Sequence, residues 1–131
     1  MPERNSDYTI LIAEDNSINR FVLTSMLKDL NKRIVQVENG REALDALEEL
    51  KQTATVLLLD LNMPVLDGYG VIRKMAQDAE AYKHVRTMVI SGTFYSDFLE
   101  KGLGEHICAY LEKPVVKEQL IHKLRECVIN F

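Results

Sequence analysis

Short apolar runs alternate along this chain with segments whose apolar residues recur at helical spacing. The runs are rich in aliphatic and β-branched residues, which is typical of strands in a parallel sheet that helices cover on both faces. They occupy residues 8–13, 33–38, 56–60, 85–91 and 107–114. The pattern therefore predicts five strands.

Between the strands, apolar positions spaced three and four residues apart predict amphipathic helices. These positions are Ile18, Phe21, Val22, Met26 and Leu30 after the first strand, Ala43, Leu44, Leu47 and Leu50 after the second, Val71, Ile72, Met75 and Ala79 after the third, and Leu120, Leu124, Cys127 and Val128 after the fifth, with Val116 and Ile121 flanking the last set. Residues 92–106 hold three glycines, so any helix there should be short and mobile. Alternating strands and helices predict an α/β fold, a doubly wound parallel sheet with right-handed crossovers.

Composition limits the function classes. The 131 residues fit one domain, expected over 1–131 with its core at about 8–130, and 47% hydrophobic with 27% charged residues is typical of a globular chain. No apolar run approaches the roughly 20 residues that span a bilayer, and the N-terminus lacks the apolar stretch of a signal peptide. We therefore expect a cytoplasmic domain without membrane insertion.

The net charge bears on nucleic-acid binding, and the cysteine content bears on disulfide formation. A net charge of −4 with scattered basic residues argues against nucleic-acid binding, which needs clustered cations. Cys108 and Cys127 could pair by number alone, but in a cytoplasmic domain of this size we expect them to be buried thiols.

Polar residues that can do chemistry follow four of the five strands. Glu14 and Asp15 end the first strand, Asp60 the third, Ser91 the fourth and Lys113 the fifth. Each alone has a simpler explanation as a helix cap, a turn residue or a solvated cation. Parallel strands bring these ends to one edge of the sheet, where such folds bind ligands, so together they predict a site.

The carboxylates of this site predict a metal. Three carboxylates at one edge repel each other unless a cation neutralises them. Oxygen ligands without a histidine or thiolate nearby favour Mg²⁺, with Mn²⁺ as a substitute.

Four motifs in this order carry a resemblance. The segments "AEDN", "LLLDLNMPVLDGYG", "ISG" and "AYLEKP" resemble the receiver domain of two-component response regulators over about residues 8–130. The resemblance implies a flavodoxin-like sheet with strand order 2-1-3-4-5. The segment "EDNSINR" is similar to receivers attached to hybrid histidine kinases, so we expect a stand-alone receiver or one excised from a longer protein, without an output domain before the end at Phe131.

The resemblance also implies roles for the site residues. Asp60 would accept a phosphoryl group from the phosphohistidine of a histidine kinase or histidine phosphotransfer protein. Asp15, Asp60 and the backbone carbonyl of Asn62 would bind Mg²⁺, and Glu14 would act through a metal-bound water. Lys113 and Ser91 would contact phosphoryl oxygens, which suits a reaction that depends on positioning and charge neutralisation.

Phosphorylation would be communicated through Ser91 and Tyr110. The serine would move toward the phosphoryl group and Tyr110 would rotate inward, which changes the surface of the fourth helix, fifth strand and fifth helix for a downstream protein partner. We expect Phe98 in the core and Phe94 or Tyr95 exposed on this surface. The resemblance further implies a cis peptide between Lys113 and Pro114.

Two enzymatic or cofactor-binding alternatives fit the sequence less well. A flavin mononucleotide module needs a phosphate cradle after the first strand, where Glu14 and Asp15 would repel the phosphate. A phosphohydrolase of the haloacid dehalogenase type needs a second aspartate two residues after its nucleophile, where this chain has Asn62. The chain is therefore expected to catalyse only its own phosphorylation and slow dephosphorylation, with a purely structural interaction domain as the open alternative.

Overall fold

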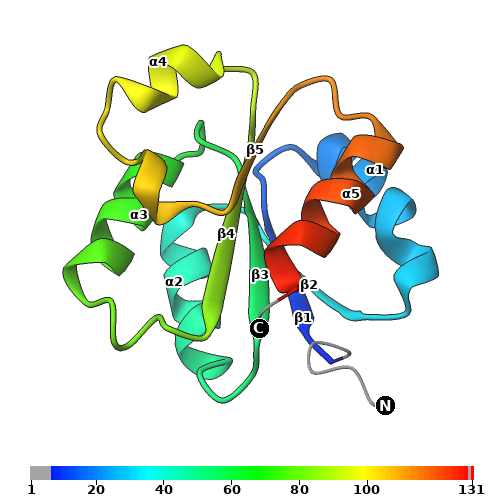
Figure 1. The fold of residues 1–131 in the computed structure, drawn as a ribbon, viewed down its shortest axis with the longest axis horizontal. Coiled ribbons are helices and arrows are strands. Elements are labelled where there is room, and N and C mark those ends of the chain that lie inside the picture. The colour runs from blue at the N-terminus through cyan, green and yellow to red at the C-terminus, as the bar shows by residue number, and fades with distance from the viewer. Residues whose placement is uncertain (1–6, 130) are drawn as a thin grey trace.

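The computed structural model describes residues 7–129 and residue 131, and its centre is a parallel sheet of five strands. The strand order is β2-β1-β3-β4-β5, which confirms the predicted flavodoxin-like topology (Figure 1). The strands are β1 (Thr9–Ala13), β2 (Arg33–Val37), β3 (Thr55–Leu59), β4 (Val85–Ser91) and β5 (Ala109–Glu112).

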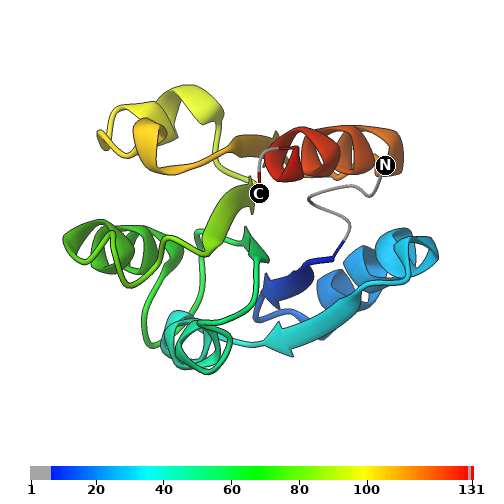
Figure 2. The ribbon, with the colours of Figure 1, turned by 60° about the horizontal axis from the view of Figure 1, so that its bottom comes forward.

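Helices cover both faces of the sheet. Seen end-on, α1 and α5 lie on one face and α2, α3 and α4 on the other (Figure 2). The helices are α1 (Ser17–Leu27), α2 (Gly40–Glu49), α3 (Gly68–Gln77), α4 (Tyr95–Leu99) and α5 (Lys117–Val128), with 3₁₀ turns at Lys28–Leu30 and Gly104–His106.

Side-chain caps fix where the first three helices begin. Asn16, Asn39 and Asp67 each precede a helix and accept a hydrogen bond from the backbone N–H three residues later. No such side-chain bond caps α4, which is only five residues long, as the three glycines around it predict. The loops that lead from β1 and β3 into their helices are thus held at defined positions.

Two apolar cores lie on either side of the sheet. The core under α2, α3 and α4 contains Leu47, Ile72 and Phe98, and the core under α1 and α5 contains Leu27 and Leu124. β1 and β3 contribute to both cores because successive side chains of a strand point to opposite faces.

The apolar positions that predicted α1 and α3 are not all buried. On α1 the buried residues are Leu23 and Leu27, whereas Ile18 and Phe21 are 70% and 71% exposed. Helix α3 ends at Gln77, so Ala79 lies in an exposed turn rather than on its inner face. The apolar side chains on the outer side of α1 are therefore largely open to solvent.

The expectation of two free thiols is also wrong, because Cys108 and Cys127 form a disulfide. Cys108 directly precedes β5, and Cys127 lies in the last turn of α5, which runs back along that strand. The return brings their Cα atoms to 5.6 Å, a separation typical of disulfides.

The two ends of the described chain meet at the sheet edge where the strands begin. The rings of Tyr8 and Phe131 lie 6.5 Å apart between centroids. In the described part of the chain, no helix combines the length and apolar character that a membrane span requires. The expected core at 8–130 includes residue 130, which lies outside the described residues.

Candidate phosphoacceptor site

The predicted site residues of β1, β3 and β5 meet at the carboxyl edge of the sheet. Lys113 Nζ lies 2.7 Å from Glu14 Oε1 and 3.4 Å from Asp60 Oδ2. The side chains of Glu14 and Asp60 are almost fully buried, and that of Lys113 is 27% exposed. One ammonium group therefore bridges two buried carboxylates that belong to neighbouring strands.

Strand pairing places these acids side by side. The N–H of Asp60 donates to the carbonyl of Ala13 at 3.0 Å, and the N–H of Glu14 donates to the carbonyl of Val37 at 3.1 Å. These bonds extend the ladders β3–β1 and β1–β2 by one residue beyond the strands. Backbone register, rather than loop flexibility, thus sets the separation of the two carboxylates.

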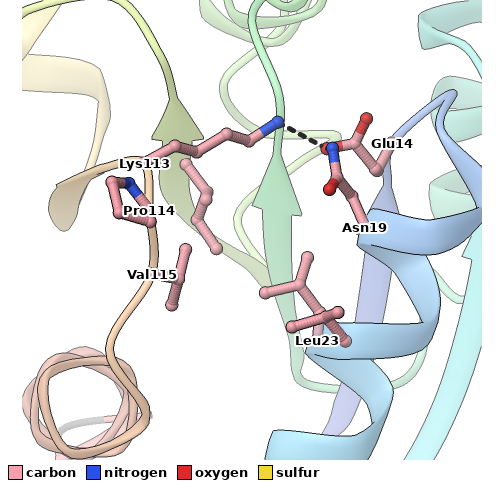
Figure 3. A pocket seen from close by; sticks show the side chains of 8 residues that line it. Glu14, Asn19, Leu23, Lys113, Pro114 and Val115 are labelled. Carbon is pink, nitrogen blue, oxygen red and sulfur yellow. Dashed lines mark hydrogen bonds and ion pairs between the residues drawn. The ribbon is translucent and has the colours of Figure 1, made fainter.

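Lys113 reaches the acids from the opposite side of a cavity. Figure 3 shows its side chain extending from the loop after β5 toward Glu14 and Asn19, with Leu23, Pro114 and Val115 below. The cavity has a volume of about 430 Å³. The Lys113–Pro114 peptide is cis, which confirms that prediction.

The pKa values of the two buried acids shift in opposite directions. Burial, together with the charge of Glu14, raises the pKa of Asp60 to about 6. Burial also opposes ionisation of Glu14, but hydrogen bonds from Lys113 and from the backbone N–H of Asn16 outweigh it and lower its pKa. Lys113 has a raised pKa because its bonds to both carboxylates outweigh its own desolvation. The ammonium therefore stays charged and is shared unequally between the two acids.

Two residues of α1 that the sequence analysis did not assign hold Glu14 in place. Arg20, with a side chain only 15% exposed, donates from Nη1 to the backbone carbonyl of Glu14 at 2.7 Å. Asn19 Nδ2 lies 3.5 Å from Glu14 Oε1. Both belong to the "EDNSINR" segment, five and six residues after Glu14.

The loop after β3 approaches Asp60 closely. Asn62 donates its N–H to Asp60 Oδ1 at 3.2 Å, and the N–H of Gly68 donates to the carbonyl of Leu61 at 3.0 Å. A Cβ on Gly68 would lie 2.5 Å from the carbonyl oxygen of Asp60. A side chain at this start of α3 would therefore collide with the backbone at Asp60 and Leu61.

Ser91 and Tyr110 meet at the adjacent corner of the sheet. Ser91 is fully buried, and its Oγ accepts the N–H of Thr93 at 3.1 Å. Tyr110 donates its hydroxyl to the Thr93 carbonyl at 2.6 Å, and burial raises its pKa to about 12. Its ring lies 5.1 Å from that of Phe98 and 5.0 Å from that of Tyr95. Tyr110 thus already points toward the loop after Ser91 in this structure.

Exposure around α4 follows the prediction. Phe98 is fully buried, whereas Phe94 and Tyr95 are 64% and 44% exposed. The N–H of Tyr95 donates to Glu112 Oε2 at 3.0 Å, which ties the start of α4 to the end of β5.

The acids fit a divalent cation. Glu14, Asp15 and Asp60 each offer a carboxylate oxygen, and these oxygens all lie within 4.8 Å of one another. Lys113 neutralises only part of this charge, and Asp15 is exposed at the mouth of the site. An all-oxygen donor set with an open side suits Mg²⁺, which keeps several waters when bound.

This arrangement agrees with the family that the sequence matches. Residues 10–125 match the family model described as "Response regulator receiver domain". The chain belongs to the response regulator receiver family. Receiver domains act in two-component signalling, and their general role is to accept a phosphoryl group.

Solved receivers share the fold. The receiver domain of the sensor histidine kinase PA1611 from Pseudomonas aeruginosa PAO1, described with a magnesium ion coordinated in its active-site cleft, has a TM-score of 0.80 and 28% identity. The match covers 93% of this receiver and 98% of that domain.

Hybrid kinases are among the curated relatives. The peroxide stress-activated histidine kinase mak3 of Schizosaccharomyces pombe is 35% identical over 130 residues, which is 92% of this receiver and 5% of that protein. Hybrid signal transduction histidine kinase A of Dictyostelium discoideum is 32% identical over 108 residues, 80% of this receiver and 5% of that protein. The receiver spans well under half the length of these relatives.

Proposed function

We propose that this receiver accepts a phosphoryl group on Asp60 from a phosphohistidine donor, in a reaction that requires Mg²⁺. The observation that supports this most directly is the buried Asp60 carboxylate at the carboxyl edge of the sheet, with Lys113 Nζ at 3.4 Å and two further acids within 4.8 Å. A buried anion with a fixed cation beside it is suited to nucleophilic attack on an anionic phosphoryl group.

The metal would be held by Asp15, Asp60 and the backbone carbonyl of Asn62, with Glu14 acting through a water. When bound, Mg²⁺ would neutralise negative charge on the acids and on the phosphoryl oxygens. Mn²⁺ would substitute because it accepts the same oxygen ligands.

An Asp60 carboxylate oxygen forms the new bond to phosphorus, while the bond from phosphorus to the donor imidazole breaks and its electron pair stays on the imidazole nitrogen. With a pKa of about 6, Asp60 is mainly ionised at neutral pH, as attack requires. Lys113 would neutralise one phosphoryl oxygen and Ser91 would donate its hydroxyl to another.

The phosphoryl group should then persist. Asn62, two residues after Asp60, cannot act as the acid or base that a phosphohydrolase of the haloacid dehalogenase type uses at that position. The receiver therefore catalyses its own phosphorylation and only slow dephosphorylation.

The exposed apolar stripe of α1 supports a protein donor. Ile18, Phe21 and Val22 are exposed on the helix that begins beside Glu14 and Asp15, and large exposed apolar side chains near a site favour protein contacts. We assign this stripe to the docking of a histidine kinase or histidine phosphotransfer protein. We expect the transfer to take place in the cytoplasm.

The test is intact mass after incubation with acetyl phosphate and Mg²⁺. We expect the mass of one phosphoryl group on the wild type, and none on Asp60→Asn or in excess chelator. A phosphoryl group on another residue of the wild type, or phosphorylation without a divalent cation, would refute the assignment.

We further propose that the surface of α4, β5 and α5 carries the signal to a downstream protein. Ser91, Thr93 and Tyr110 are already linked by hydrogen bonds at the corner between the site and this surface. Beryllofluoride with Mg²⁺ should shift backbone NMR signals across residues 91–112 as well as at the site. Shifts confined to Glu14, Asp15, Asp60 and their neighbours would exclude this route.

A further inference from the structure

The disulfide joins two parts of the proposed output surface. Cys108 is exposed and directly precedes β5, whereas Cys127 is 5% exposed in the last turn of α5. The bond therefore fixes the end of α5 to the beginning of β5.

A groove runs along the same surface, and Cys108 lines it. The groove has a volume of about 610 Å³, and its walls include Tyr95, Tyr110, Glu112, His122 and Lys123. Both Tyr110 and Glu112 contact the segment after Ser91. Tyr110 donates a hydrogen bond to the carbonyl of Thr93, and Glu112 accepts one from the N–H of Tyr95. One groove thus contains both the exposed cysteine and the residues that would respond to phosphorylation.

We propose that Cys108 and Cys127 form a thiol–disulfide exchange site for protein or small-molecule dithiols, and that its redox state sets the shape of this groove. The consequence for signalling rests on the output route proposed above, whereas the exchange chemistry does not. A disulfide in a cytoplasmic protein is usually transient or regulatory, because that compartment keeps thiols reduced.

One molecule of a dithiol reductant is enough to complete the exchange. A thiolate of the reductant attacks Cys108 Sγ and forms a mixed disulfide, while the bond to Cys127 breaks and the Cys127 thiolate takes up a proton. The second thiol of the reductant then displaces Cys108. Two electrons pass to the protein pair, and the products are two protein thiols and one oxidised reductant.

The surroundings of the two sulfurs suit this order of steps. Cys108 is the exposed cysteine of the pair and lines the groove, so a reductant can approach it. Cys127 is packed in the core under α5, which shields it from direct attack. With only two cysteines in the chain, exchange cannot scramble to another pair.

The test combines alkylation with NMR on the full chain. Native protein is treated with dithiothreitol, alkylated with iodoacetamide and weighed, and reduced protein is reoxidised with oxidised glutathione. We expect no alkylation before reduction, two alkylated cysteines after it, and closure of the bond on reoxidation. Reduction should shift backbone signals around Tyr95, 108–112 and 119–127 while the sheet signals persist.

Three outcomes would overturn the proposal. The first is that dithiothreitol opens the bond only in denaturant. The second is that the thiols are free and do not form a disulfide with oxidised glutathione. The third is that reduction leaves the NMR signals of the groove residues unchanged. Cys108→Ser, which changes the exposed cysteine, should reproduce the reduced spectrum without reductant. Phosphorylation of Asp60 by acetyl phosphate, measured in both redox states, reports separately on the proposed function.

Discussion

Replacing Asp60 with asparagine should stabilise the metal-free receiver at neutral pH, although it removes the proposed phosphoacceptor. The carboxylate is 6% exposed and close to Glu14, so its charge is unfavourable in the folded state. Asparagine has nearly the same shape and carries no charge. Its side-chain oxygen can still accept from the N–H of Asn62, while its amide nitrogen replaces the Oδ2 that now faces Lys113.

The magnitude follows from the pKa. Its rise from 3.8 to about 6 corresponds to roughly 3 kcal/mol against the charged form. Since Asp60 and Glu14 titrate together, we expect a net gain of about 1–3 kcal/mol in the free energy of unfolding for Asp60→Asn. A raised folded pKa means that the unfolded chain releases the proton first, so the wild type loses stability as pH rises. The difference should be near zero below about pH 4, grow between about pH 4 and 6, and stay constant above that range.

Urea denaturation in chelator, followed by circular dichroism across this pH range, measures the difference. Asp45→Asn, which removes an exposed carboxylate on α2, is the matched control and should show no such pH-dependent gain. Mg²⁺ should then stabilise the wild type more than Asp60→Asn, because binding to the folded state adds stability. An Asp60→Asn protein that is no more stable than the wild type at neutral pH, or a difference that does not change with pH, would refute the reasoning.

Four further changes test other parts of the structure. Gly68→Ala should cost about 1–3 kcal/mol and slow phosphorylation, because the new methyl group meets the Asp60 carbonyl at 2.5 Å, whereas Gly92→Ala meets nothing within 4 Å; urea midpoints compare the two. Phe21→Glu should slow transfer from a phosphohistidine protein by about tenfold, a loss of roughly 1.4 kcal/mol, while acetyl phosphate labelling stays the same; equal loss with both donors would contradict a docking role. Arg20→Met should weaken Mg²⁺ binding by about tenfold in calorimetry, with partial rescue by Arg20→Lys; unchanged affinity would rule out a positioning role. Cys108→Ser should lower the free energy of unfolding by about 3 kcal/mol, since the bond closes a loop with a sequence separation of 19; no change against oxidised wild type would count against a stabilising bond.

Strand positions and strand ends were predictable because burial on both faces leaves a simple apolar signal. The polar residues that end these runs were also informative, because parallel strands bring their carboxyl ends to one edge of the sheet. The structure places Glu14, Asp60 and Lys113 within bonding distance, as that reasoning requires.

The inner face of α1 was not predictable from spacing alone. Ile18, Phe21 and Val22 form one apolar stripe, and Leu23 and Leu27 form another. Helical periodicity identifies both stripes but does not say which one faces the sheet.

Contacts that depend on tertiary geometry were also beyond the sequence. The disulfide requires α5 to bring Cys127 back to the start of β5, and composition instead favoured free thiols. The Arg20 bond ends on a backbone carbonyl, and a carbonyl has no signature in the sequence.

The contact between Tyr8 and Phe131 has a consequence for protein engineering. Because the two ends of the described chain meet at the edge where the strands begin, a short linker could join them without crossing the edge that holds Glu14, Asp60 and Lys113. New termini could then be opened in the exposed turn at residues 78–81, on the same side of the sheet. Such a circular permutant would start with β4 and β5 and end with α3, so that Asp60 and Lys113 would exchange their order along the chain while keeping their places in space.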